Sequence, residues 1–191
     1  MRIWVSSLML GAAMALSSCS TAPAPRTVVP VRTAAPGASL PYQWTQGNAP
    51  QAYKDSVAAF GRLALAPGQY RWLAAIPEGE TKIVIDRLTQ TFYVYRGDRL
   101  VGVSSMSSGK KGKETPLGFW AVMRKQKRGF SRKYDNAPMP FMQMYDDKGI
   151  AFHAGPNPGY PASHGCVRLP LKFAERLYGL TVMGSKVIIE G

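Results

Sequence analysis

The sequence contains few cysteine, histidine and acidic residues. Its 191 residues include two Cys, two His and 11 Asp and Glu, against 24 Lys and Arg. Two cysteines cannot build a disulfide-dense scaffold, and two histidines supply little material for a His-based metal cluster. The shortage of acids leaves a formal net charge of +13, which points to an acidic partner such as nucleic acid, a membrane surface or an anionic polymer.

The N-terminus carries an apolar run that is too short to cross a membrane as a helix. Residues 3–16 are uncharged and mostly apolar, and Arg2 precedes them. A short positive start followed by such a run is typical of a secretory signal peptide rather than of a transmembrane helix. With 46% hydrophobic residues, the chain has enough apolar material for a folded core, and its length fits one ordinary domain.

A cysteine follows the apolar run after two serines. The sequence LSSC at residues 16–19 resembles a bacterial lipobox, which implies that residues 1–18 are removed as a signal peptide and that Cys19 is lipidated. A plain signal peptide that is cut near Ala22 or Ala24 is the alternative.

The residue after Cys19 bears on the destination of the protein. Ser20 stands there rather than Asp, which by the same resemblance favours sorting to the outer membrane. We therefore expect a lipid-anchored protein of the cell envelope, on the periplasmic face of the outer membrane. Its partners would include the membrane, through the lipid anchor, and the cell wall. Nucleic acid is not expected as a partner, because an exported protein meets no genome.

The chain divides into segments of different composition. Residues 19–51 are rich in Pro and Ala, contain no acid and show no hydrophobic periodicity, so we interpret them as a tether. Residues 52–80 predict a short helical lead-in, because apolar side chains recur at helical spacing before Pro67 and Gly68. These side chains are Tyr53, Val57, Phe60 and Leu63.

Residues 81–191 show short β-prone segments separated by turns. The expected strands cover residues 82–86, 91–95, 100–105, 119–123, 141–145, 150–153 and 186–190, with a hairpin turn at 96–99. We expect these strands to pair as hairpins rather than through crossovers. Pro170 begins a predicted helix that reaches about Tyr178, with Gly179 at its end. The pattern predicts a mainly β domain with one or two helices.

If lipid occupies Cys19, Cys166 is the only thiol left, and both histidines of the chain lie close to it. His153 ends an expected strand, and His164 is two residues before the cysteine. Cysteine acts as a nucleophile through its thiolate, and a free thiol needs a neighbouring base to take its proton at neutral pH. The pattern therefore predicts a cysteine nucleophile with a histidine base.

The loop before Cys166 has a composition that suits an active site. Residues 154–165 contain three glycines and three prolines around Tyr160 and Ser163. Glycine next to the cysteine leaves backbone N–H groups unshielded, as an oxyanion pocket requires. Proline reduces the mobility of such a loop, which favours a preorganised site.

These residues resemble the signature of a known family. The sequence FHAG at 152–155, followed by SHGCVRL at 163–169, is similar to the motif of the L,D-transpeptidase catalytic domain (YkuD) family. The segments KIVIDRLTQTFYVYRGDRLV at 82–101 and TPLGF at 115–119 support the resemblance. It covers residues 81–191 and implies a mixed β-sandwich catalytic domain.

The resemblance also implies an activity. The enzyme would transfer an acyl group from a tetrapeptide stem of peptidoglycan, releasing the terminal D-alanine and forming a 3-3 crosslink with an amine of a second stem. Cys166 matches the nucleophile and His153 the general base, and the backbone carbonyl of Ala154 would orient the base. Neither a metal nor a cofactor is implied.

Further positions match the family's pocket. The resemblance implies that the backbone amides of His164, Gly165 and Cys166 form the oxyanion hole, and that Ser163 and His164 shape the pocket. Arg168 matches a position linked to loop structure and substrate binding. We also expect Tyr160, in the same loop, to contact substrate.

Other interpretations remain open at this point. The acyl acceptor would be a stem amine, an amine of an envelope protein or water, which correspond to crosslinking, protein attachment and hydrolysis. A zinc site built from His153, His164 and Cys166 is a second chemical interpretation. The chain would otherwise be an inactive wall-binding lipoprotein, with Cys166 and His153 as packing residues.

A basic tract lies at residues 110–133. Nine Lys and Arg residues are opposed there only by Glu114. A solvated face and a surface that attracts anionic wall components are both consistent with it. The apolar residues Met139, Phe141, Met142, Met144 and Tyr145 that follow indicate core or lid packing.

Overall fold

A computed structural model describes residues 41–191, so the expected signal peptide and Cys19 lie outside the described residues. Within this range the chain forms ten strands in two sheets and two helices. The prediction of a mainly β domain with one or two helices is confirmed. Neither of these helices is long and apolar enough to cross a membrane.

The larger sheet has six strands in the order β1-β4-β3-β2-β10-β5. Its last strand in sequence, β10, lies between β2, with which it runs parallel, and β5, with which it runs antiparallel. The strands are β1 (Tyr70–Trp72), β2 (Thr81–Asp86), β3 (Thr91–Arg96), β4 (Arg99–Ser105), β5 (Gly118–Ala121) and β10 (Lys186–Glu190).

The smaller sheet has four strands in the order β6-β7-β8-β9. Its pairs β6·β7 and β7·β8 are antiparallel, and β8·β9 is parallel. The strands are β6 (Arg124–Phe130), β7 (Pro138–Met144), β8 (Ala151–Ala154) and β9 (Val167–Leu169). The connection from β8 to β9 is the loop that ends at Cys166.

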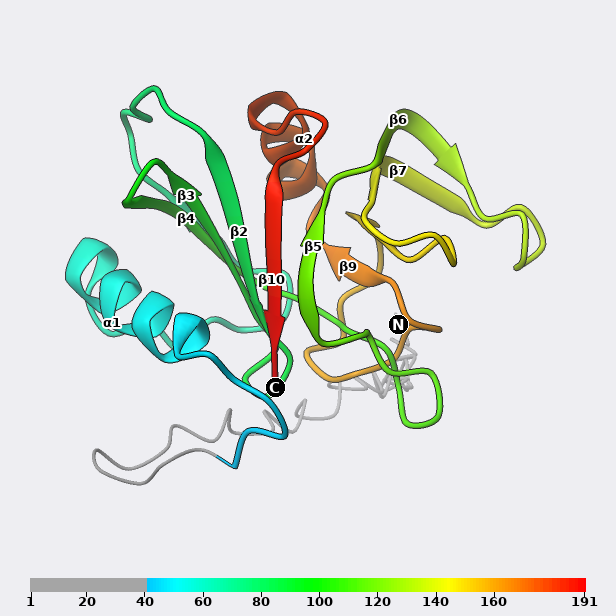
Figure 1. Ribbon diagram of the computed structural model, residues 1–191, viewed down its shortest axis with the longest axis horizontal. Coiled ribbons are helices and arrows are strands. Elements are labelled where there is room, and N and C mark those ends of the chain that lie inside the picture. The colour runs from blue at the N-terminus through cyan, green and yellow to red at the C-terminus, as the bar shows by residue number, and fades with distance from the viewer. Residues whose placement is uncertain (1–40) are drawn as a thin grey trace, which may run out of the picture. The chain divides into compact units, whose positions relative to one another are not determined.

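The hydrophobic core lies between the two sheets and beneath the helix α2 (Leu171–Leu180). Figure 1 shows α2 and the four-stranded sheet on one side of the six-stranded sheet, and the helix α1 (Asn48–Phe60) on the other. Alternate residues of β2 and β10 face the core, as period-two patterning requires. Phe173 of α2 anchors the helix there, because it is fully buried and stacks on Trp72 with ring centroids 4.6 Å apart.

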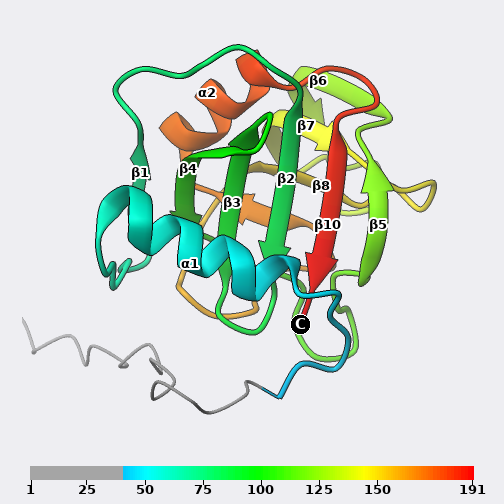
Figure 2. The same ribbon diagram turned by 60° about the vertical axis from the view of Figure 1, so that its left-hand side comes forward.

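The helix α1 covers the outer face of the six-stranded sheet (Figure 2). Its contact residues Ala49 and Ala52 are small and fully buried, which lets the helix lie close to the strands. The buried carboxylate of Glu190, at the end of β10, accepts hydrogen bonds from the backbone amides of Gln46, Asn48 and Ala49. A negative charge therefore satisfies the free amides at the positive end of the helix and joins it to the sheet.

The structure corrects several details of the expected elements. The first helix begins at Asn48, inside the segment interpreted as a tether, because Glu190 caps it there. The pair β10·β2 is a parallel crossover rather than a hairpin, and the sequence did not predict the strand β9, which pairs in parallel with β8. The final helix includes Gly179 and ends at Leu180.

The basic tract contains a strand that the sequence did not predict. Arg124–Phe130 forms β6, which pairs on one side with β7. Lys125 is only partly exposed, and its Nζ donates to the backbone oxygen of Tyr178, at the C-terminus of α2, over 2.7 Å. A cation is favourable at the negative end of a helix, so this residue has a structural role. Its neighbours Arg124, Lys127 and Arg128 are exposed.

Replacing Glu190 tests how strongly the carboxylate joins α1 to the sheet. We expect Glu190→Gln to lower the free energy of unfolding by about 2 kcal/mol at pH 7, because charged hydrogen bonds to buried amides are lost. Chemical denaturation measures the change. Glu175→Gln, which removes only an exposed ion pair with Lys172, is the matched control and should change stability by less than about 0.5 kcal/mol.

The carboxylate of Glu190 also makes the free energy of unfolding depend on pH, with a definite sign. Burial by itself raises the pKa of Glu190, but the hydrogen bonds outweigh burial, and the pKa lies below its ordinary value of 4.5. The stabilisation is therefore complete above pH 4.5 and is lost as the pH falls through the lowered pKa. A stability difference between the wild type and Glu190→Gln that stays constant down to pH 3 would contradict this assignment.

Candidate active site

The register of β8 and β9 brings the predicted site residues onto one face of the smaller sheet. His153 pairs with Arg168, and Phe152 with Val167. Phe152 and Val167 lie in the core, so His153 and Arg168 project from the opposite face. Cys166 is two residues before Arg168 and shares its face, which makes it a diagonal neighbour of His153.

One hydrogen bond determines the tautomer of His153. Its Nδ1 lies 2.9 Å from the backbone oxygen of Ala154, as expected from the sequence resemblance. Because a carbonyl oxygen only accepts hydrogen bonds, Nδ1 carries the hydrogen and Nε2 keeps a free lone pair. Burial lowers the pKa of His153; the Ala154 bond acts against this, and the positive charge of Arg168 lowers the pKa further. The imidazole is therefore a neutral base at neutral pH.

Cys166 lies in an apolar environment on the same face. Its side chain packs against a cluster formed by Met139, Met142 and Ala151, beside Met144. Burial raises the pKa of the thiol, and the nearby charge of Asp146 adds to this effect. A backbone hydrogen bond with Ala151 and the charge of Arg168 act in the opposite direction. The resting pair is therefore a neutral thiol beside a neutral imidazole.

Arg168 has both a backbone and an electrostatic role. Its amide and carbonyl exchange two hydrogen bonds with Ser107, at 2.9 and 3.0 Å. Its side chain lies against Gly155, where an added Cβ would come within 3.3 Å of Arg168 Cγ and of His153 Cε1. The charge lowers the pKa of both His153 and Cys166. Arg168 therefore disfavours imidazolium and favours thiolate.

The turn before Cys166 is closed by its own hydrogen bonds. The Ser163 hydroxyl donates to the backbone oxygen of Cys166 and accepts from the amide of Gly165 over 3.0 Å. The Gly165 amide, one of three expected to line an oxyanion pocket, is therefore engaged within the turn. In the described part of the chain, the amides of His164 and Cys166 have no hydrogen-bond partner. They are the two donors available to an oxyanion.

Gly165 is favoured by the backbone conformation of the turn, and its lack of a side chain leaves room for Ile150. Its φ of +121° lies where side chains are rarely found. An added Cβ would come within 2.7 Å of Ile150 Cδ1. Glycine therefore permits both the turn and the contact beneath it.

Thr115 supports this turn from behind, and its role was not recognised in the sequence. Its buried hydroxyl accepts from the amide of Gly109 over 2.9 Å and donates to the backbone oxygen of Gly165 over 2.7 Å. The TPLGF segment indicated that the position matters but gave no partner. Only the fold brings Thr115 next to Gly165, which lies 50 residues further along the chain.

A second hydrogen-bond chain supports the loop through Ser108. The side chain of Gln90 binds Ser108 twice, at its amide and at its hydroxyl. The Ser108 carbonyl in turn accepts from the amides of Ala162 and Ser163, each over 3.0 Å. The segment at 82–101 that resembles the family contains Gln90, but the sequence gave no partner for Gln90 and no signal for Ser108, because glutamine and serine are common in turns.

The remaining predicted site residues lie at the surface around this centre. His164 is exposed and stacks on Tyr134 from the loop between β6 and β7, with ring centroids 4.5 Å apart. Tyr160 is 61% exposed, and its backbone oxygen accepts from the Ser107 hydroxyl. Tyr145 and Phe141, by contrast, pack into or against the main core.

The zinc interpretation finds no support in the grouping of side chains. Within residues 41–191, no three His, Cys, Asp or Glu side chains come together in a way that could hold a metal ion. His164 faces Tyr134 rather than joining His153 and Cys166.

Comparison with known proteins gives one family. The family model of the L,D-transpeptidase catalytic domain (YkuD) matches residues 80–189. These residues contain every element from β2 to β10 except the last residue of β10, and all of the site described above, with Cys166, His153 and Thr115. No curated protein matches the chain.

Solved structures of L,D-transpeptidases share the fold. One from Stackebrandtia nassauensis is 25% identical with a TM-score of 0.54, and the match covers 61% of this chain and 58% of that one. One from Mycobacterium tuberculosis is 21% identical with a TM-score of 0.56, and covers 59% and 58%. One from Xylanimonas cellulosilytica is 23% identical with a TM-score of 0.54, and covers 71% and 68%. The chain thus spans less than two thirds of the length of the first two.

The electrostatics of Cys166 predict how its thiol reacts with pH. Because burial raises its pKa above the ordinary value of 9.0, we expect the rate of alkylation by iodoacetamide to rise with a midpoint above pH 9. Mass spectrometry of the modified protein measures the rate. Arg168→Gln should move the midpoint to higher pH, and Arg62→Gln, at an exposed position, should leave it unchanged. A plateau of full reactivity at pH 6 to 7 would contradict the neutral pair.

Replacing Thr115 tests the support beneath the turn. Thr115→Val keeps the shape but leaves the Gly109 amide and the Gly165 carbonyl buried without a partner. We expect the free energy of unfolding to fall by about 3 kcal/mol. Thr115→Ser keeps the hydroxyl and should lose less than half as much. Equal losses for the two variants in chemical denaturation would contradict a support that rests mainly on the hydroxyl.

Proposed function

Since the chain belongs to the L,D-transpeptidase catalytic-domain (YkuD) family, we propose that it is a peptidoglycan L,D-transpeptidase with Cys166 as its nucleophile. The observation that carries this proposal is the hydrogen bond from His153 Nδ1 to Ala154, on the face of β8 and β9 that also presents Cys166. It leaves Nε2 of the imidazole free to accept the proton of a thiol. The substrate would be a tetrapeptide stem.

The first half-reaction forms a thioester. As the Cys166 sulfur attacks the carbonyl carbon of the third stem residue, its proton passes to Nε2 of His153. The negative oxygen of the tetrahedral intermediate accepts hydrogen bonds from the amides of His164 and Cys166. The bond to the terminal D-alanine then breaks, and His153 returns the proton to the leaving amine.

The second half-reaction transfers the acyl group. An amine of a second stem attacks the thioester carbonyl, His153 takes the proton of the amine, and the thiol is released as a 3-3 crosslink forms. Arg168 assists the first step and opposes build-up of imidazolium, since its charge lowers the pKa of both partners. Proton transfer is therefore coupled to attack and does not precede it.

Incubation with purified tetrapeptide muropeptides tests the reaction. We expect loss of D-alanine, an acyl adduct on Cys166 and crosslinked dimers, all detected by mass spectrometry. Cys166→Ala should abolish all three, and Ser20→Ala, remote from the site in sequence, should abolish none. Release of D-alanine without dimers would identify water as the acyl acceptor. An acyl adduct that reacts only with an amine of a protein would instead identify the reaction as attachment of an envelope protein. Absence of any adduct would contradict the enzymatic proposal.

The proposal places the enzyme at the envelope through a lipid on Cys19. The lipobox-like segment before Cys19 supports this, with the outer membrane as destination because Ser20 follows. Metabolic labelling with a tagged fatty acid should mark the wild-type chain and not Cys19→Ser. Equal labelling of both chains would contradict lipidation at this residue.

A further inference from the structure

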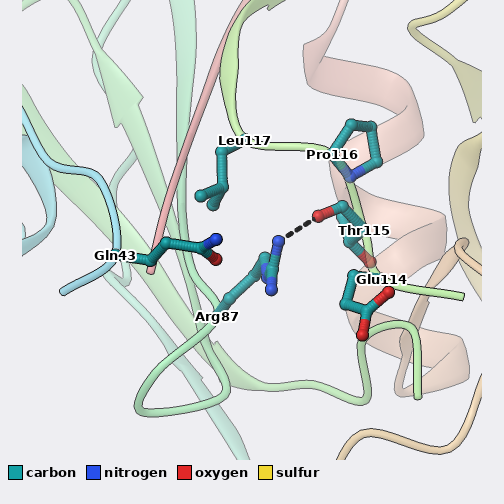
Figure 3. Close-up of a pocket in the computed structure, with 6 residues that line it drawn as sticks. All are labelled: Gln43, Arg87, Glu114, Thr115, Pro116 and Leu117. Carbon is teal, nitrogen blue, oxygen red and sulfur yellow. Dashed lines mark hydrogen bonds between the residues drawn. The ribbon is translucent and has the colours of Figure 1, made fainter. Parts of the chain in front are cut away.

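A polar pocket lies on the opposite side of Thr115 from the catalytic turn. It has a volume of about 370 Å³ and is lined by Gln43, Arg87 and residues 114–117. Figure 3 shows the guanidinium of Arg87 at the centre, the amide of Gln43 facing it, and Glu114 and Thr115 on the other side. Its walls come from the segment before α1, the turn after β2 and the segment before β5. None of these residues takes part in the proposed reaction.

Arg87 is held firmly but has donors to spare. Its amide donates to the Glu190 carbonyl over 2.8 Å, and its carbonyl accepts from the side chain of Gln90. Its Nη1 donates to the backbone oxygen of Thr115. A guanidinium has five N–H donors, and the structure of residues 41–191 shows no partner for the others. The half-buried cation therefore presents free donors to the pocket.

The pocket carries charge of both signs. Glu114 is exposed at its edge and forms no ion pair within 4 Å among residues 41–191, while its Oε1 accepts from the Gly112 amide over 2.7 Å. The pKa of Glu114 lies below its ordinary value, chiefly because the Gly112 amide donates to the carboxylate, and the charges of Arg87 and Lys111 lower it further. A cation and an anion are thus held apart across an open space.

We propose that this pocket binds a small zwitterionic α-amino acid. The ligand carboxylate pairs with the free N–H groups of Arg87, and its ammonium group pairs with Glu114. The Gln43 amide provides one further polar contact. Pro116 and Leu117 supply an apolar wall that suits a small side chain such as a methyl group.

Size and charge both favour this ligand over a simple anion. A simple anion would leave Glu114 unpaired and would be repelled by it, whereas a zwitterion satisfies both charges. A volume of about 370 Å³ holds an amino acid together with a few water molecules and is small for a longer peptide. The same chemistry is found in a free amino acid and at the exposed end of a branched peptide, so the test includes both.

The direct test is calorimetric titration of the full chain, purified in detergent, with D-alanine and L-alanine. We expect binding with a dissociation constant of about 1 mM. N-acetylalanine and alanine methyl ester each lack one charge and should bind at least tenfold more weakly. Equal binding of N-acetylalanine would overturn the zwitterion assignment, and absence of binding by both enantiomers of alanine would overturn the site. Tighter binding of a branched peptide whose side chain ends in an α-amino carboxylate group would identify such a peptide, rather than a free amino acid, as the ligand.

Variants locate the binding. Arg87→Gln and Glu114→Gln should each weaken alanine binding at least tenfold. Glu114 is fully exposed, so its variant keeps the test valid if Arg87→Gln fails to fold. Arg71→Gln and Glu78→Gln, at exposed positions away from the pocket, are the matched controls and should bind as the wild type does. Alanine binding that survives Glu114→Gln would overturn the assignment.

Chemical modification separates this pocket from the catalytic site. After Cys166 has been alkylated with iodoacetamide, alanine should bind with an unchanged dissociation constant. Loss of binding on alkylation would assign the amino acid to the catalytic site and overturn the second site. The measurement requires no enzymatic turnover, so it gives a result whether or not the proposed transpeptidation is found.

Discussion

The arrangement of the candidate site depends on the register of two short parallel strands. β8 and β9 share only three residue pairs, yet the pair His153 and Arg168 determines which side chains meet. Because side chains alternate along a strand, a shift of one residue would turn Cys166 and Arg168 into the core and leave His153 alone on the outer face. Short strands specify register weakly by themselves, so the surrounding contacts have to maintain it.

Those contacts come from a segment far away in sequence. Ser107 pairs with Arg168, Ser108 holds the amides of Ala162 and Ser163, and Thr115 holds Gly165. Buried hydrogen bonds of this kind are costly to break, which makes the loop before Cys166 a rigid part of the site. In the proposed reaction, this rigidity would keep the imidazole of His153 in position to take the proton of the buried, neutral thiol during attack.

The residues that support the site also connect it to the rest of the domain. Arg87 bonds Glu190, Gln90 and Thr115, so it lies between the helix-capping carboxylate, the loop support and the polar pocket. Glu190 in turn holds α1 and the residues before it, including the segment with Gln43. The last residues of the segment interpreted as a tether are therefore in hydrogen-bonded contact with the sheet.

The sequence alone determined what is local, namely most of the β-prone segments and the final helix, and its rare residues predicted a site at Cys166 and His153 with a glycine-rich turn. Its patterns did not show that β10 pairs in parallel with β2, or that β9 pairs in parallel with β8. They also did not show that Lys125 and Glu190 cap helices. Nor did they show that Thr115, Gln90 and Ser108 support the loop before Cys166. Each of these is a contact between distant segments made by common residue types, and local periodicity contains no information about it. Only the tertiary structure decided that the Gly165 amide is engaged within its turn and that a second, charged pocket lies behind Thr115. Both depend on which backbone groups are left free once the chain has folded.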